Sequence, residues 1–223
     1  TGVQTCALPI SDRLHVQWLE AVARLDGAIC ISRSVADDLA RWLDQSGLDG
    51  PEGGEFKIGW FHLGADFRPA DPGRDGAGEV ERILAPLAGR PTFLMVGTIE
   101  PRKGYRETLE AFSRLWDRGV DVNLVIVGRE GWTHLASAMR RDIPATVDRL
   151  RRHPERGRRL FWLEGIDDAG LEKVYAAGTC LIAASYGEGF GLPLIEAARR
   201  RLPILARDIP VFREVAGDHA AYF

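Results

Sequence analysis

The sequence predicts an α/β protein built on a doubly wound parallel sheet. From residue 91 onward, short apolar runs alternate with segments whose apolar residues recur at helical spacing. The runs at 92–96, 123–127 and 179–184 are almost continuously apolar, which is typical of strands buried on both faces. Strands that alternate with helices form parallel sheets, because each crossover helix returns the chain to the same edge.

Composition excludes several classes of protein. The chain has 223 residues, 45% of them hydrophobic and 27% charged, as in an ordinary globular protein. A formal net charge of −3 provides no electrostatic basis for binding nucleic acid. Cys6, Cys30 and Cys180 lack metal-ligand spacing, so we expect reduced thiols and a cytoplasmic location. No apolar run approaches the ~20 residues of a membrane span.

The first 90 residues divide into three parts. Residues 1–10 have no regular period and no initiating methionine, and we predict a non-native junction there. Residues 11–62 are predicted to be the tail of an N-terminal domain, and residues 63–90, rich in glycine and proline, to be a linker with a short helix at 79–84. Within the tail the expected order is a helix at 12–25, a strand at 28–31, a helix at 33–44 capped by Ser32, and a strand at 56–60.

Residues 91–223 are predicted to form the main domain. Its strands are expected at 92–96, 123–127, 160–163, 179–184 and 203–206, with another beginning at 221. Its helices are expected at 103–118, 135–141, 144–152, 168–177 (capped by Asp167), 193–201 and 211–215. Ligands bind at the carboxyl ends of strands in such sheets, which directs attention to the loops at 97–103, 128–132, 165–167 and 187–191.

The loop at 187–191 carries the strongest functional signal. Glycines occupy every second position, and Pro193 follows at the expected start of a helix. Such a turn presents backbone N–H groups and the positive end of a helix dipole to an anion. Glu188 and Glu196 flank the turn, and carboxylates accept hydrogen bonds from sugar hydroxyls. We therefore predict a site for a phosphorylated, hydroxyl-rich ligand; the alternative is that Glu196 is a surface residue and Glu188 merely favours the helix N-terminus.

Arg102 and Lys103 are the second signal. Two cations at the predicted helix start oppose the helix dipole, at a cost of about 0.3–1 kcal/mol each when exposed. A bound diphosphate would reverse the sign of that effect. A solvated basic pair is the alternative interpretation.

Four motifs together resemble one enzyme family. Glu188 and Glu196, with Gly-Phe-Gly-Leu-Pro between them, resemble the signature of the retaining glycosyltransferase family 4. The segment Gly-Thr-Ile-Glu-Pro-Arg-Lys-Gly at 97–104 resembles the first loop of that family's donor-binding domain. The segments at 62–66 and 208–217 also resemble the family, so that the likeness covers about residues 27–223.

The resemblance implies a two-domain B-type glycosyltransferase, with two Rossmann-like domains facing a cleft. Residues 11–62 would then end the acceptor-side domain, and residues 91–223 would bind a nucleoside-diphosphate sugar. The implied catalytic residues are Arg102 and Lys103, which would hold the diphosphate, and Glu188, which would contact the sugar. The implied donor-binding residues are Gly97 in the first loop, Ile166 near the base, the turn residues Gly189, Phe190 and Gly191, Leu192 and Pro193 beside the phosphates, and Glu196 at the ribose. The family implies neither a metal ion nor another cofactor.

The expected reaction is transfer of a hexose to a glycan or lipid-linked acceptor, with retention of configuration. The loop at 128–132 and the segment at 62–66 resemble mannosyltransferase-like members, which favours GDP-mannose and a role in polysaccharide or O-antigen assembly. The alternatives are a nucleotide-sugar 2-epimerase of the same fold and a non-catalytic nucleotide-sugar-binding module. Most of the domain that would carry the acceptor site and the family's usual catalytic histidine is expected to lie upstream, so we expect this chain alone to be inactive. Five arginines at 151–159 are interpreted as a solvated face, with contact to the inner face of the plasma membrane as the alternative.

Overall fold

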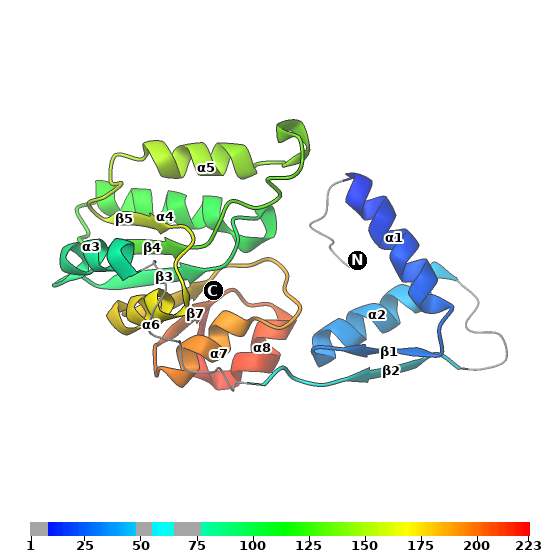
Figure 1. Cartoon of the computed structure of the whole chain (residues 1–223). Helices are drawn as coiled ribbons and strands as arrows, with labels where there is room; N and C mark the ends of the chain where they lie inside the picture. The colour runs from blue at the N-terminus through cyan, green and yellow to red at the C-terminus, as the bar shows by residue number, and fades with distance from the viewer. Residues whose placement is uncertain (1–8, 48–54, 65–76) are drawn as a thin grey trace.

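A computed structural model describes residues 9–47, 55–64 and 77–223, which form two separate parallel sheets (Figure 1). Residues 1–8 of the predicted junction and residues 65–76 of the linker predicted at 63–90 lie outside the described residues. Within those residues, no helix has the length and apolar character needed to cross a membrane.

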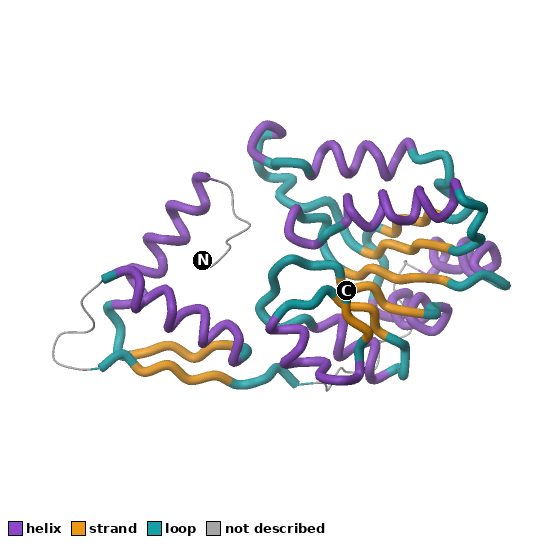
Figure 2. Tube along the Cα trace, turned by 180° about the vertical axis from the view of Figure 1, so that it is seen from behind, coloured by secondary structure: helices purple, strands orange, loops and turns teal. Residues whose placement is uncertain are grey.

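The N-terminal part is a two-stranded sheet with two helices. Its elements are α1 (Pro9–Ala23), β1 (Gly27–Cys30), α2 (Arg33–Ser46) and β2 (Lys57–Trp60). Strands β1 and β2 run parallel, with Gly27 opposite Lys57. Helix α2 begins where predicted, because the Ser32 hydroxyl accepts a hydrogen bond from the Val35 amide at 3.2 Å. Seen from behind, this part lies beside the larger sheet (Figure 2).

The larger sheet has six parallel strands in the order β5-β4-β3-β6-β7-β8. Their bounds are β3 (Thr92–Val96), β4 (Asn123–Val127), β5 (Leu160–Leu163), β6 (Cys180–Ala183), β7 (Ile204–Ala206) and β8 (Ala221–Tyr222). The chain winds outward from β3 to β5, returns to β6 beside β3, and then winds the opposite way. The predicted doubly wound sheet is confirmed, and its switch point lies between β3 and β6.

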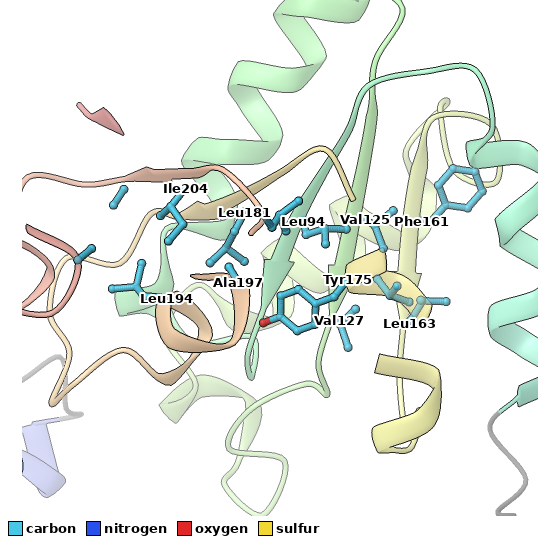
Figure 3. Packing of buried hydrophobic residues seen from close by; sticks show 14 of the residues in the cluster. Leu94, Val125, Val127, Phe161, Leu163, Tyr175, Leu181, Leu194, Ala197 and Ile204 are labelled. Atoms are coloured by element: carbon cyan, nitrogen blue, oxygen red, sulfur yellow. The ribbon is translucent and has the colours of Figure 1, made fainter. Parts of the chain in front are cut away.

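Helices cover both faces of this sheet. One face carries α4 (Tyr105–Asp117) and α5 (Ile143–Arg152); the other carries α3 (Ala77–Leu87), α6 (Asp168–Ala177), α7 (Leu192–Arg199) and α8 (Pro210–Ala216). Alternate residues of strands β3 to β7 enter the two cores, as Leu124 and Val125 of β4 illustrate. Figure 3 shows the core on the face covered by α3, α6, α7 and α8, where Tyr175 and Ala197 pack against the strands. Burial on both faces explains why the strands are almost entirely apolar.

Two helix predictions are wrong in part. The helix expected at 135–141 is only a short 3-10 turn, Ser137–Met139, and Arg141 has a left-handed φ of 51°. Most of this segment is exposed, so no apolar face packs to stabilise a helix there. The helix expected from residue 103 begins at Tyr105, because Gly104 has a φ of 72° that no α-helix accommodates.

Gly104 generates a stability prediction. An alanine Cβ at this position would lie 2.5 Å from the Ala184 carbonyl oxygen, in addition to the strain of the left-handed backbone. We expect Gly104→Ala to lower the free energy of unfolding by about 2–4 kcal/mol, measured by urea denaturation. Gly119→Ala is the matched control, since Gly119 has a φ of 78° but a Cβ added there would have no heavy atom within 4 Å. We expect it to cost only about 1 kcal/mol; equal losses would contradict the proposed steric constraint.

Candidate functional site

The candidate site lies at the switch point, where the loops after β3 and β6 leave the sheet in opposite directions. The two loops contact each other directly: the Tyr186 amide donates to the Arg102 carbonyl at 2.8 Å. Gly104 packs against Ala184 in the same contact. Segments 85 residues apart in the sequence therefore form one surface, at the position where parallel α/β sheets bind their ligands.

Glu188 lies at the centre of this surface. Its Oε1 is 2.5 Å from the Lys103 ammonium, and its Oε2 is 2.6 Å from Nη1 of Arg102. The Ser185 hydroxyl donates to Oε1 at 2.7 Å. Arg102 also donates to the Gly187 carbonyl at 2.9 Å and pairs with Glu100 at 3.0 Å. The structure thus brings together the three residues that the resemblance implies are catalytic.

Charge decides the protonation of Glu188. Burial of its side chain, which is only 10% exposed, opposes ionisation. The charges of Lys103 and Arg102 outweigh that effect and hold the pKa of the Glu188 carboxyl below its usual value. The carboxylate is therefore charged at neutral pH and neutralises about half of the positive charge beside it.

The sequence predicted that Arg102 and Lys103 lie at the start of a helix, and this prediction is wrong. They belong to a 3-10 turn, Pro101–Lys103, and Gly104 separates this turn from α4. The left-handed Gly104 turns the chain, and the Lys103 ammonium lies close to the Gly97 backbone. The Tyr105 hydroxyl donates to the Gly97 carbonyl at 2.5 Å, which ties the first turn of α4 to the loop. The two cations therefore do not belong to the first turn of α4, where the sequence predicted them to oppose the helix dipole.

The turn before α7 has the predicted geometry. Gly191, with a φ of 97°, is the N-cap of α7 and has no side chain that could cap the helix, and Pro193 lies in its first turn. Leu192 is 39% exposed, whereas Phe190 is buried. A pocket at this edge of the sheet is lined by Lys103, Ser185, Glu188, Gly191 and Pro193, together with apolar residues of β3 and β6.

Glu196 and Ile166 have partners on other elements of the sheet. The carboxylate of Glu196, on α7, accepts a hydrogen bond from the Tyr175 hydroxyl at 2.6 Å. Arg200 lies over the Tyr175 ring, 4.6 Å from its centroid, and donates to the Glu196 carbonyl. Ile166 is half-buried against the core, after the left-handed Gly165. The functional roles implied for these residues stay predictions.

Sequence reasoning missed three residues that support the site: Ser185, Tyr105 and Tyr175. Ser185 and Tyr105 adjoin the motifs in the sequence, so their proximity was a usable signal. Tyr175 had no such signal, because an apolar helix position predicts packing and not a hydrogen bond to Glu196. Among the described residues, no group of three or more histidine, cysteine, aspartate or glutamate side chains is placed to hold a metal ion.

Comparison with known proteins identifies the family. The family model described as "Glycosyl transferases group 1" matches residues 79–223, which is more than half of the chain. The chain belongs to this family. It is 44% identical over 207 residues to the serotype-specific mannosyltransferase WbdA of Escherichia coli, and the match covers 92% of this chain but 24% of WbdA. It is 32% identical over 136 residues to the O-antigen chain mannosyltransferase B of E. coli, covering 59% of this chain and 32% of that protein.

The fold is that of a B-type glycosyltransferase. A UDP-forming α,α-trehalose-phosphate synthase from Burkholderia vietnamiensis superposes with a TM-score of 0.71 at 14% identity, covering 97% of this chain and 55% of that chain. The predicted family and fold are confirmed. This group 1 glycosyl transferase chain spans about a quarter of WbdA.

The buried Tyr175 generates a prediction of how stability depends on pH. Burial raises the pKa of Tyr175, and its carboxylate partner Glu196 raises it further. Above pH ~10, the unfolded chain releases this phenolic proton and the folded chain retains it, so that stability falls as pH rises. We expect Tyr175→Phe to reduce that slope by up to about 1.4 kcal/mol per pH unit in urea denaturation between pH 10 and 11. Equal slopes for Tyr175→Phe and the unsubstituted chain would contradict the assignment.

Proposed function

We propose that this chain binds a nucleoside-diphosphate sugar at the switch point, and that the whole protein transfers a hexose from it to an acceptor hydroxyl. One observation carries the proposal: Arg102, Lys103 and Glu188 meet beside the N-terminus of α7, in a cluster that can exchange its carboxylate for a diphosphate. Two cations and a helix N-terminus suit a diphosphate. The carboxylate suits the hydroxyls of a sugar.

The proposed chemistry depends on stabilising a leaving group. The bond between the sugar C1 and the diphosphate oxygen breaks, the acceptor oxygen bonds to C1, and the acceptor proton leaves with solvent or the departing phosphate. Arg102 and Lys103 stabilise the charge that develops on the diphosphate. Since these side chains supply the positive charge, we propose that no metal ion takes part. Same-face attack, with retention of configuration, completes the proposal.

The relatives support the choice of sugar. Both relatives described above are named as mannosyltransferases, and the name of one of them refers to an O-antigen chain. We therefore propose GDP-mannose as donor, a glycan or lipid-linked acceptor, and a cytoplasmic location. The exposed arginines at 151, 152, 156 and 158 would allow peripheral contact with anionic lipid at the inner membrane face.

Nucleotide binding tests the proposal directly. Calorimetry of this chain with GDP, UDP and ADP should give the tightest binding for GDP. Lys103→Ala should weaken GDP binding by about 10- to 100-fold, the loss of one charge-assisted contact. Lys173→Ala is the matched control, because Lys173 is paired with Glu81 on the surface and should leave binding unchanged. A folded chain that binds none of the three nucleotides would overturn the proposal.

Glu188 should affect the diphosphate and the sugar in opposite directions. Its carboxylate competes with a diphosphate for Arg102 and Lys103, so Glu188→Gln should tighten binding of GDP by about 3- to 10-fold. The same change should remove the additional affinity that GDP-mannose gains from its sugar. Calorimetry with both ligands checks the prediction. A parallel weakening for GDP and GDP-mannose would contradict the proposed competition.

The reaction type needs the complete protein with its donor. Transfer requires an acceptor, and we expect the sugar of GDP-mannose to remain unchanged when donor alone is supplied. Conversion at the sugar C2 without acceptor would overturn transfer in favour of 2-epimerisation. Unchanged transferase activity after Glu188→Ala and Lys103→Ala would overturn the site assignment and favour a non-catalytic nucleotide-binding role for this part of the protein.

A further inference from the structure

The N-terminus of α2 is capped by a residue from the opposite end of the chain. The Arg33 and Ser34 amides donate to Oε1 and Oε2 of Glu214, each at 2.7 Å, and the Ser34 hydroxyl donates to Oε2 at 2.6 Å. Glu214 lies on α8, 180 residues away along the chain. His62, which follows β2, is 2.6 Å from Oε1. One carboxylate thus joins the N-terminal part of the chain to the six-stranded sheet.

The same turn of α2 contacts the glycine turn of the candidate site. Ser32 is completely buried, and its hydroxyl donates to the Gly189 carbonyl at 2.7 Å while it caps α2. Ile31 packs against Gly189 so closely that an added Cβ there would lie 2.9 Å from its Cδ1. The His62 ring lies 5.5 Å from the buried Phe190 ring. Glu188, which pairs with the two cations, is the immediate neighbour of Gly189.

We propose that Glu214 is a positioning residue that, by capping α2, holds Ser32 and Ile31 against Gly189 and so fixes the turn that carries Glu188. The proposal rests on the proposed nucleotide-sugar function only for its effect on ligand binding. Its structural half, the dependence of the turn on Glu214, stands on the contacts alone. Glu214 bonds to the start of α2 and to His62 in the segment after β2, and it acts on the glycine turn through Ser32.

The Glu214 carboxylate is charged at neutral pH, so its hydrogen bonds to α2 and His62, which we call the Glu214 clamp, are retained there. Burial opposes ionisation of Glu214, but hydrogen bonds from Ser34, His62 and the two amides lower its pKa to about 2. The positive end of the α2 dipole acts in the same direction. Two charged groups nearby have partners of their own: the Arg33 side chain lies 3.7 Å from Asp37, and Arg213 pairs with Asp208. Because the folded-state pKa is depressed, the clamp is complete above pH ~4.5 and is lost as pH falls toward 2.

Amide hydrogen exchange tests the structural half without a ligand. In Glu214→Gln, the carboxamide presents one oxygen where the carboxylate presents two, so the amides of Arg33 and Ser34 should exchange faster at pH 7. The amides at 189–191 should also exchange faster, because the turn would lose its support from Ser32. Asp208→Asn is the matched control, because it removes an exposed carboxylate that precedes the same helix. Unchanged exchange at 189–191 in Glu214→Gln would overturn the proposal.

GDP affinity tests the functional half, at a temperature where each variant remains folded by circular dichroism. Glu214→Gln and Ser32→Ala should each weaken GDP binding by about 2- to 30-fold, and their combination should weaken it no more than either change alone. Glu214→Asp, which retains both oxygens, should recover part of the affinity. Lower stability with unchanged GDP affinity would show that Glu214 is merely structural and would overturn the positioning role. If the unsubstituted chain itself binds no GDP, the proposed function fails. The exchange measurement still decides whether the turn at 189–191 depends on Glu214.

Discussion

The bridge from Glu188 to Arg102 and Lys103 is the interaction on which the carboxyl edge of the sheet depends. Two adjacent cations repel each other, and a carboxylate between them removes that repulsion while joining the loop after β6 to the loop after β3. The bridge lies beyond the ends of the paired strands β3 and β6, where it supplements the backbone hydrogen bond from Tyr186 to Arg102. In the proposed function, a diphosphate that took the place of the carboxylate would preserve the connection and release Glu188 toward the sugar.

Close approach of the backbones makes this bridge possible. A Cβ at Gly128 would lie 1.9 Å from the Gly97 carbonyl oxygen, and one at Gly104 would lie 2.5 Å from that of Ala184. Any side chain at these positions would push the loops apart and lengthen ion pairs that are now 2.5–2.6 Å long. These glycines serve packing between loops, which is a different role from the anion binding predicted for the glycines of the turn at 187–191. The short distances from Glu188 to Arg102 and Lys103 therefore depend on glycine at positions 104 and 128.

The sequence predicted most of the fold because burial on both faces leaves a clear local pattern. Strand β4 is apolar at all but its first position, and each helix on the sheet presents an apolar face. The predictions failed where tertiary contacts were needed to decide. Residues 135–141 have the composition of a helix but no core to pack on, and the left-handed conformation of Gly104 cannot be read from the residue type alone.

The sequence by itself determined the family, the order of the strands along the chain, the caps at Ser32 and Asp167, and the residue types available for an anion site. Tertiary structure alone decided which groups meet. Glu188 pairs with Lys103 across 85 residues, and Glu196 accepts a hydrogen bond from Tyr175 on α6. Glu214 reaches Arg33 across 181 residues. Such contacts depend on strand order and register, which bring distant segments within hydrogen-bonding distance and leave no periodic trace in the local sequence.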